Sequence, residues 1–342
     1  MDTKVFVSDP HHPNEQAIDI CSRILLEGGL VAFPTETVYG LGANALNAEA
    51  VKKIFLAKGR PQDNPLILHV LDMGMAKEYV TDIPVVAQVL AKAFWPGPLS
   101  MIFKKSGVLP PVVTAGLDTV AVRVPDHPVA LALIRGCNVP ISAPSANTSG
   151  RPSPTDGSHV MEDLSGKIDA IIDSGKCRIG LESTVVDLTV HPPRVLRPGG
   201  IPFSELSILV KDIEKGFSKA VEEKPRSPGM KYAHYSPDSP MVVVKGDPLD
   251  VAGKINALAS ASSRPGILCS RETYDLYPTG QKLCVGSLLD PGEIAGNLFE
   301  CFRLFNKLDV DIIYSEYFEI LYHGEAVMDR LMKASGYQLI HL

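Results

Sequence analysis

Two cationic side chains stand two residues apart in the stretch KGRPQDNP, residues 58–65. We expect Lys58 and Arg60 on an irregular segment, where they are not spaced four apart along a helix. Their charged heads can therefore converge on one anion instead of pairing with acidic neighbours on a helix. Asn64 adds an amide to the same stretch. These residue types at this spacing predict an anion-binding site.

A third cation, Arg123, stands between valines in TVAVRV, residues 119–124, which has the alternation of a strand. An arginine there either extends its head to solvent from an edge strand or points into a polar pocket. If the guanidinium is buried it needs a counter-anion, and a substrate carboxylate would serve. His69 near the end of PLILHV is ambiguous, because a lone histidine at such a position is often an ordinary core residue.

The stretch PISAPSANTSGRPSPT, residues 140–155, is the densest polar segment of the chain. Its serine and threonine hydroxyls, together with Asn147 and Arg151, follow a short apolar strand. A flexible surface loop is the simpler interpretation, but such loops are rarely introduced by a buried strand and fixed by several prolines. A rigid array of hydroxyl and backbone donors suits phosphate oxygens.

A fourth polar segment is FPTETVYGLG, residues 33–42. It could be an ordinary strand followed by a turn. A turn requires the glycines, however, and has no need for the polar residues beside them, which are Thr35, Glu36, Thr37 and Tyr39. We therefore favour a functional interpretation. Later in the chain, ESTVVD supplies Ser183 and Thr184.

The chain as a whole is acidic, with a formal charge of −6. Cations nevertheless recur near loop positions of its first part: Lys58, Arg60, Arg123, Arg178 and Arg197. This pattern indicates a focused anion site and not a diffuse basic surface. The phosphate-binding motifs G-x-x-x-x-G-K-[ST] and G-x-G-x-x-G are absent, and no Ser-His-Asp or Cys-His arrangement stands out. The implied chemistry is positioning and charge neutralisation on phosphates.

A chain of 342 residues is too long for one average domain, and its length suggests two domains. Helices expected near 15–27, 48–57, 85–94 and 127–136 are interspersed with many strands, which predicts one α/β or α+β domain over residues 1–208. Residues 209–239 are rich in charge, then in proline, serine and glycine, and are expected to connect the domains. Residues 240–342 alternate strands and helices, which is typical of a small Rossmann-like three-layer α/β domain.

The remaining sequence signals concern location. The six cysteines show no zinc-site spacing and are expected to be reduced thiols. The first residues lack the features of a signal peptide, and no apolar run is long enough to cross a bilayer. We expect a cytoplasmic protein without membrane contact.

Several segments together resemble the threonylcarbamoyl-adenylate synthase family, with its YrdC-like catalytic domain. They are GGLVAFPTETVYGLG, KGRPQDNPLILHV, WPGPLS, VAVRVPDHP, PISAPSANTSGRPSPT, ESTVVD and VLRPGG. The resemblance covers residues 15–202, with the family's K-x-R and S-x-N signatures at 58–60 and 145–147. SPGMKYAHYSP, residues 227–237, and the trailing α/β unit resemble the long two-domain branch of the family.

The resemblance implies a YrdC-like twisted open mixed sheet with flanking helices. It also implies a nucleotidyltransferase that converts L-threonine, bicarbonate or CO2, and ATP into threonylcarbamoyl-AMP and pyrophosphate. Mg2+ would be held mainly by the ATP phosphates and by no side chain. A separate transferase would place the threonylcarbamoyl group on the adenosine beside the anticodon of tRNA, which leaves room for a weak contact with tRNA.

Roles for individual residues also follow from the resemblance. Lys58 and Arg60 would be catalytic, acting on the α-phosphate. L-Threonine would be bound by Thr37, His69, Arg123, Ala143 and Ser183. ATP would be bound by Arg60, Asn64, Thr119, Ser145, Asn147, Ser153, Arg197 and Tyr235. Residues 209–239 would act as a lid on the active site. Ala233 departs from the family pattern, since relatives often carry Arg or Thr there.

Two alternatives stay open at this stage. One is a YrdC-like module that binds double-stranded RNA or tRNA without catalysis, although an acidic chain disfavours the broad phosphate-contacting surface that this requires. The other is an enzyme that transfers a carbamoyl group from carbamoyl phosphate to a protein thiol. Such enzymes carry zinc-finger and acylphosphatase-like segments, and neither pattern is visible here.

Overall fold

The structure, a computed structural model, describes residues 2–217 and 235–342. The chain divides into two units. Residues 1–149, 153–178 and 182–231 form the first, and 150–152, 179–181 and 232–342 form the second. Most of the connector predicted to act as a lid, from 218 to 234, lies outside the described residues. No helix within the described ranges is long and apolar enough to span a membrane.

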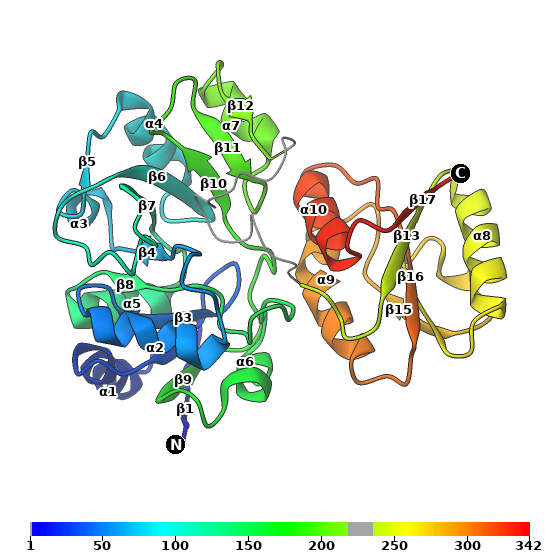
Figure 1. Ribbon diagram of the computed structural model, residues 1–342, viewed down its shortest axis with the longest axis horizontal. Coiled ribbons are helices and arrows are strands. Elements are labelled where there is room, and N and C mark those ends of the chain that lie inside the picture. Colours follow the sequence, from blue (N-terminus) through cyan, green and yellow to red (C-terminus); the bar gives the residue numbers. More distant parts are fainter. Residues whose placement is uncertain (1, 218–234) are drawn as a thin grey trace. The chain divides into compact units, whose positions relative to one another are not determined.

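A mixed sheet with helices against it forms the first unit (Figure 1). Its strands are β1 (Lys4–Val7), β2 (Val31–Phe33), β3 (Gly40–Asn44), β4 (Ile67–His69), β5 (Val80–Thr81), β6 (Leu99–Lys105), β7 (Thr119–Arg123), β8 (Ile141–Ser142), β9 (Ala170–Asp173), β10 (Thr184–Asp187), β11 (Arg194–Arg197) and β12 (Glu214–Lys215). Its helices are α1 (Glu15–Leu26), α2 (Ala48–Lys58), α3 (Met73–Ala76), α4 (Val85–Phe94), α5 (Pro128–Cys137), α6 (Gly157–Leu164) and α7 (Phe203–Leu209).

The strands follow the order β1-β9-β2-β3-β8-β4-β7-β6-β10-β11-β12, and β5 pairs with β6 beside that path. Parallel and antiparallel pairs are mixed: β4 runs parallel to β7, whereas β6 runs antiparallel to β7. This architecture confirms the predicted mixed sheet with flanking helices. The pairing of β12 with β11 also extends the first sheet into the segment expected to be a connector.

Helices cover both faces of the sheet around β2. Because successive side chains of a strand point to opposite faces, Val31 and Phe33 pack with α1 and α5, while Ala32 packs with α2 and α6. These two apolar clusters make this half of the sheet a three-layer structure. It therefore forms a rigid support on which the neighbouring loops are built.

The other half of the sheet has two unlike faces. On one face a large apolar cluster joins strands β4, β6, β7 and β10 to helices α3, α4 and α7. On the opposite face the apolar cluster is small and consists of strand residues alone: Ile67, Ile102, Ala121, Val185 and Leu196. We call this second surface the strand face. Polar residues of the same strands alternate onto it.

Local sequence sets the end of α2, which corrects one prediction. The side chain of Asn47 caps the start of this helix by accepting hydrogen bonds from the backbone of Glu49 and Ala50. Gly59, with φ of 61°, forms the left-handed cap at its end. Lys58 is therefore the last helical residue and only Arg60 lies beyond the helix, so the two cations do not share an irregular segment.

A second difference concerns the two glycines of YGLG, which the simpler interpretation of that segment placed in a turn. Gly40 and Gly42 instead form part of β3, which pairs antiparallel with β2. A Cβ atom at residue 42 would lie 2.9 Å from both the Phe33 ring and the Ile141 side chain. The glycine is needed for close packing, and the sequence alone gave no sign of that contact.

The second unit is a parallel sheet in the order β15-β14-β16-β13-β17. Its strands are β13 (Met241–Lys245), β14 (Pro265–Cys269), β15 (Gln281–Cys284), β16 (Ile312–Glu316) and β17 (Leu339–His341). Helix α8 (Pro248–Ser260) packs on one face, while α9 (Pro291–Phe305) and α10 (Gly324–Ala334) lie on the other (Figure 1). The predicted three-layer α/β unit is confirmed.

Gly42→Ala should destabilise the first unit by about 1–3 kcal/mol, because the added methyl group overpacks the contact with Phe33 and Ile141. Trp95, the single tryptophan of the chain, reports unfolding of this unit by fluorescence in urea. Gly107→Ala is the matched control, since a Cβ there meets nothing within 4 Å. An unchanged urea midpoint for Gly42→Ala would contradict the packing argument.

Candidate active site

The strand face carries polar side chains because β7 alternates. Thr119, Ala121 and Arg123 project to the same side, and His69 of β4 is paired with Arg123. Thr119 and Arg123 are separated by four residue steps, or about 13 Å of strand. Thr119, which is predicted to bind ATP, thus begins β7, whereas Arg123, which is predicted to bind threonine, ends it. The candidate site extends along the strand face.

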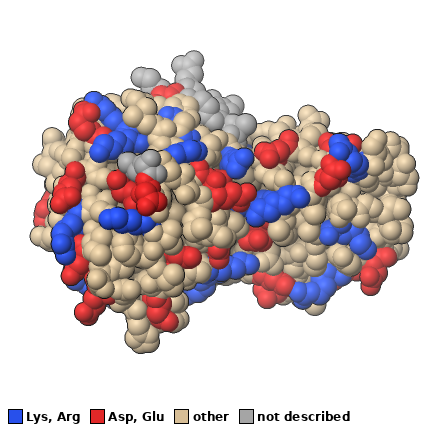
Figure 2. Space-filling model, turned by 90° about the horizontal axis from the view of Figure 1, so that it is seen from below, with Lys and Arg blue, Asp and Glu red and all other residues tan. Residues whose placement is uncertain are grey.

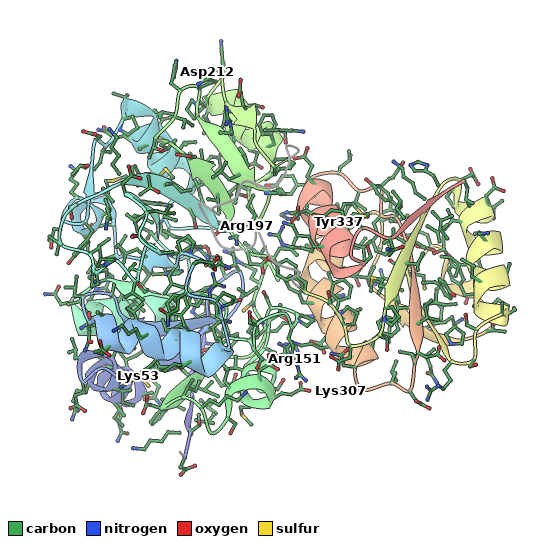
Figure 3. All side chains as sticks on the ribbon, viewed as in Figure 1. Lys53, Arg151, Arg197, Asp212, Lys307 and Tyr337 are labelled. Carbon is green, nitrogen blue, oxygen red and sulfur yellow. The ribbon has the colours of Figure 1, made fainter. Side chains whose placement is uncertain are left out.

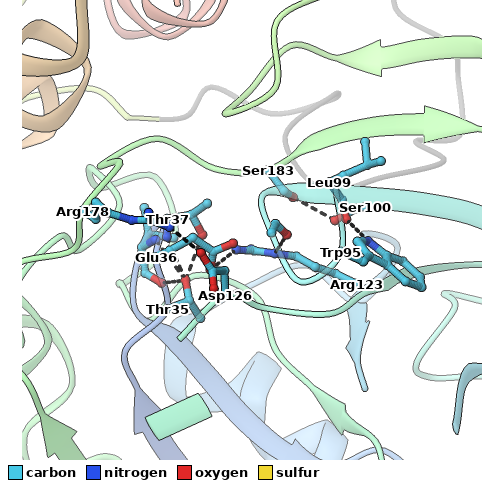
Figure 4. A network of polar contacts seen from close by, with 12 residues as sticks. Thr35, Glu36, Thr37, Trp95, Leu99, Ser100, Arg123, Asp126, Arg178 and Ser183 are labelled. Atoms are coloured by element: carbon cyan, nitrogen blue, oxygen red, sulfur yellow. Dashed lines mark hydrogen bonds and ion pairs between the residues drawn. The ribbon is translucent and has the colours of Figure 1, made fainter. Parts of the chain in front are cut away.

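Arg123 points into the protein and not to solvent, which decides between the two sequence interpretations. Its side chain is 5% exposed, and a terminal nitrogen lies 2.7 Å from Oε2 of Glu36, whose side chain is 1% exposed (Figure 4). The Nε–H donates to the Gly97 carbonyl at 3.2 Å. Neither this terminal nitrogen nor Oε2 of Glu36 has a hydrogen-bond partner within the described part of the chain. The terminal N–H therefore does not point along the line to the Glu36 oxygen. The contact is therefore an ion pair without a formed hydrogen bond.

Thr37 lies fully buried next to Glu36 on the turn after β2. The Thr35 hydroxyl stabilises this turn, since it donates to the Val38 carbonyl at 2.6 Å and accepts from the backbone of Thr37 and Val38. It also lies 2.9 Å from the Thr37 hydroxyl. The turn therefore presents Glu36 and Thr37 in fixed positions (Figure 4).

His69 is buried and uncharged. Burial, with a smaller contribution from the nearby Arg123 guanidinium, lowers the pKa of this imidazole to about 3. Its ring lies edge-on to Phe33, with centroids 6.1 Å apart. Its Nδ1 has no hydrogen-bond partner among the residues that the structure describes. A neutral imidazole with spare hydrogen-bonding capacity therefore stands beside Arg123.

Ser183 lies at the amino end of β10, where three elements meet. Its hydroxyl is 2.8 Å from that of Ser100 on β6. Arg197, the last residue of β11 (labelled in Figure 3), donates to the Ser183 carbonyl at 2.8 Å and to its hydroxyl oxygen at 3.1 Å. The predicted threonine ligand Ser183 and the predicted ATP ligand Arg197 are thus in direct contact.

Lys58 holds the S-x-N segment. Its ammonium is buried and donates to the carbonyl oxygens of Ser145, at 2.5 Å, and of Asn147. The Ser145 hydroxyl donates to the Asn147 amide oxygen at 2.6 Å. The same segment is paired with β3, since the Ala146 N–H donates to the Tyr39 carbonyl at 2.8 Å. The structure thus joins the two signature motifs; a contact of Lys58 with phosphate stays a prediction.

The other predicted ATP residues of this region lie around that segment. Arg60 makes long contacts with the carbonyl oxygens of Asn64, at 3.4 Å, and Pro65, at 3.3 Å. Asn64 is buried, and its amide oxygen has no partner within the described residues. Ser153 donates to a carboxylate oxygen of Glu182 at 2.6 Å.

Two residues named from the sequence, Ala143 and Arg178, have contacts that bear on their roles. The Ala143 N–H donates to the Ile67 carbonyl at 3.0 Å, so a backbone contact with threonine would have to use the Ala143 carbonyl. Arg178 is 68% exposed and forms an ion pair with Asp126 at 2.5 Å. It belongs to the surface and not to the buried cations.

Tyr235 belongs to the second unit. Its ring stacks on Phe299 with centroids 5.1 Å apart, and the Arg330 guanidinium lies 5.4 Å from its centroid. The residue has a φ of 70°, which is unusual for tyrosine. Its contact with a nucleotide stays a prediction.

Three polar residues of the site were not assigned from the sequence. Glu36 was noted only as one of several polar groups, Ser100 sits in an ordinary strand pattern, and Glu182 precedes Ser183. Their importance comes from contacts between distant segments, such as Glu36 with Arg123. The one available signal was the acidic residue in an otherwise neutral turn.

The chain matches two family models. The model of the Sua5/YciO/YrdC family, described as telomere recombination, matches residues 23–199. The model described as threonylcarbamoyl-AMP synthase, C-terminal domain, matches residues 204–336.

Curated proteins and solved structures resemble the chain over nearly its full length. Threonylcarbamoyl-AMP synthase of Pyrococcus abyssi is 48% identical, with 95% of this chain and 96% of that protein covered. The Bacillus subtilis protein of the same name is 45% identical, with 98% of each covered. The crystal structure of P. abyssi Sua5 complexed with L-threonine has a TM-score of 0.94 at 46% identity, with 99% of this chain and 100% of that chain covered.

The buried neutral His69 predicts a specific acid sensitivity. Its folded-state pKa is depressed, so below the ordinary pKa of about 6.5 the unfolded chain binds a proton that the folded chain does not. Stability should fall as pH decreases from 7 to 5, with about 2 kcal/mol of the loss due to this residue.

Urea unfolding followed by Trp95 fluorescence at both pH values tests this expectation. Between pH 7 and pH 5, the free energy of unfolding of His69→Asn should decrease by about 2 kcal/mol less than that of the unsubstituted chain, since all other groups titrate alike. Equal losses in the two proteins would show that His69 does not stay neutral in the folded state.

Proposed function

Because the chain belongs to the threonylcarbamoyl-AMP synthase family, we propose that it condenses L-threonine, bicarbonate or CO2, and ATP into threonylcarbamoyl-AMP and pyrophosphate. The product would serve N6-threonylcarbamoyladenosine modification of tRNA through a separate transferase. The cytoplasmic location expected from the sequence is part of this proposal.

The observation that carries the proposal is the buried Arg123 on the strand face. A guanidinium that is 5% exposed suits a carboxylate ligand, and threonine brings one. Around it lie other hydrogen-bonding groups that suit a small polar amino acid, namely the Thr37 hydroxyl, the neutral His69 ring and the Ser183 hydroxyl. The Pyrococcus abyssi relative was crystallised with L-threonine, which supports the same ligand here.

We place ATP beside this pocket, toward the segment that Lys58 holds. Lys58, Arg60 and Arg197 supply positive charge, and Asn64, Thr119, Ser145, Asn147 and Ser153 supply neutral donors and acceptors. Fixed cations in a buried site stabilise developing phosphoryl charge strongly, because they need no reorganisation. The polar segment 144–147 is held by backbone pairing, so its donors are arranged in advance.

The chemistry follows from this arrangement. The carbamate of threonine would attack the α-phosphorus of ATP in line, while Lys58 and Arg60 stabilise charge on the α-phosphoryl oxygens. Mg2+ bound to the phosphates would neutralise the leaving pyrophosphate. Within the described ranges, no three His, Cys, Asp or Glu side chains form a group that could hold a metal. We propose that the ATP phosphates hold the Mg2+.

Neither alternative function gains support. On the face shown in Figure 2, Lys and Arg side chains are interspersed with Asp and Glu, which does not favour a broad RNA-binding surface. Residues 204–336 match the model described as threonylcarbamoyl-AMP synthase, C-terminal domain, which does not favour the carbamoyl-transfer enzyme. If the protein contacts tRNA weakly, its affinity for tRNA should fall as the salt concentration increases.

The protein should release pyrophosphate from ATP only when threonine and bicarbonate are both present, and mass spectrometry should detect threonylcarbamoyl-AMP. Serine, which lacks the β-methyl group, should react at least about tenfold more slowly. Alanine, which also lacks the hydroxyl, should be poorer still, because polar groups of the pocket would stay unpaired. Serine or alanine reacting as fast as threonine would overturn the substrate assignment.

Arg60→Ala and Lys58→Ala should each lower the threonine-dependent rate about 100-fold or more, as expected when a cation on the reacting phosphoryl group is lost. Lys52→Ala is the control, because Lys52 is a lysine of the same helix whose ammonium pairs with Glu49 at the surface. Lys58 also holds residues 145–147, so urea midpoints must accompany its rates. Near-normal turnover by a folded Arg60→Ala protein would refute the role of that cation.

A further inference from the structure

Glu36 is a buried carboxylate whose hydrogen-bonding capacity is not used. Its side chain is 1% exposed, and neither oxygen accepts a hydrogen bond from any residue that the structure describes. An ionised carboxylate can accept about four hydrogen bonds. Burying one without donors costs several kcal/mol, so apolar packing does not explain an acid at this position.

The ion pair with Arg123 compensates the charge of Glu36 but not its hydrogen bonds. A structural arginine–carboxylate pair usually aligns two parallel N–H···O bonds. Here the closest atoms are 2.7 Å apart without that alignment, and the Arg123 Nε–H is directed to Gly97 instead. Figure 4 shows the two side chains pointing toward one another beside Thr37. Both groups therefore keep capacity for a further partner.

A positive and a negative group side by side in a buried pocket are complementary to a zwitterion. We propose that Arg123 receives the threonine carboxylate while Glu36 receives the threonine ammonium and accepts one of its protons. This assignment rests on the function proposed above and deepens it. The three N–H donors of the ammonium suit a carboxylate that accepts no hydrogen bond from the residues that the structure describes. The Arg123–Glu36 pair together with a zwitterion carries no net charge.

Proton transfer is required before the amine can react. An N–H bond of the ammonium breaks, an O–H bond forms on Glu36, and the nitrogen lone pair becomes available. With bicarbonate, the amine then forms an N–C bond, a C–O bond of bicarbonate breaks, and the departing hydroxide takes a second amine proton to leave as water. The products are the carbamate, water and protonated Glu36, which returns its proton to solvent. The site remains neutral when the proton moves from the ammonium to Glu36.

The other titratable groups near Glu36 do not change charge between pH 7 and 9. His69 has a pKa of about 3. Burial lowers the pKa of His127 below its ordinary value, despite the opposing effect of Glu36 and Asp126. Burial raises the pKa of the Cys177 thiol, and Glu36 adds to this. The guanidinium of arginine is protonated throughout this pH range in proteins generally. Between pH 7 and 9, the effect of protonating the threonine amine can therefore be measured without a change of charge on these neighbouring groups.

The test compares Glu36→Gln with the unsubstituted enzyme at pH 7 to 9. We expect kcat/KM for threonine to fall about 100-fold at pH 7, as is common when a proton acceptor is removed. As the pH rises from 7 to 9, kcat/KM of the variant should then increase about tenfold per pH unit, because a growing fraction of free threonine has an unprotonated amine. Glu36→Asp keeps a carboxylate and should retain the pH profile of the unsubstituted enzyme, even with a lower rate.

A second measurement separates proton transfer from a structural role. Formation of ATP from threonylcarbamoyl-AMP and pyrophosphate does not require a proton to leave an ammonium. The rate of this reverse reaction in Glu36→Gln should therefore stay within about threefold of the rate in the unsubstituted enzyme. Asp126→Asn, which removes an exposed carboxylate nearby, is the control for altered charge and should keep a normal rate in both directions.

Three outcomes would overturn parts of this account. Unchanged kcat/KM in Glu36→Gln at pH 7 would remove the proposed role. So would an equal loss at every pH and in both directions, since Glu36 would then only support Arg123. Failure of the unsubstituted enzyme to form threonylcarbamoyl-AMP would instead overturn the function itself, and the role of Glu36 with it.

Discussion

A guanidinium held almost entirely out of water sets the constraint on which the candidate site depends. Arg123 reaches the strand face because β7 alternates, and a buried cation there requires negative charge within contact distance. Glu36 supplies that charge from a turn fixed by the Thr35 hydroxyl. The large apolar cluster on the opposite face holds the strand in place. One charged position thus links the core, the turn after β2 and the chemistry.

The other cations of the site are positioned by protein oxygens. Lys58 donates to carbonyl groups of the S-x-N segment, and Arg197 donates to the backbone and hydroxyl of Ser183. Such contacts fix both the charge and the loop that it touches, and this lowers the reorganisation needed when a ligand binds. They also couple the two motifs, because a change at Lys58 affects the position of Ser145 and Asn147. Rate and stability must therefore be measured together at this position.

The sequence predicted those features that depend on local patterns. The alternation of apolar and other residues identified β7 and left two orientations open for Arg123. The helical spacing of apolar residues predicted the bounds of α4 and α5 to within one residue. The end of α2 at Lys58 was also set by local signals, the caps at Asn47 and Gly59, but the pairing of Lys58 with Arg60 led us to expect an irregular segment instead. The sequence could not predict β3, because Gly42 is explained by its contact with a distant isoleucine and phenylalanine. Glu36 meets Arg123 across 87 positions, and no local signal reports such a contact.

Calorimetric binding of L-threonine and two analogues tests most directly the claim that the Arg123 and Glu36 pair forms the receptor for the amino acid. Threoninamide lacks the carboxylate that we assign to Arg123, and N-acetylthreonine lacks the ammonium that we assign to Glu36. The account predicts that both analogues bind at least about 30-fold more weakly than threonine, since each leaves one buried charge without its partner. Binding of either analogue as tightly as threonine would contradict it.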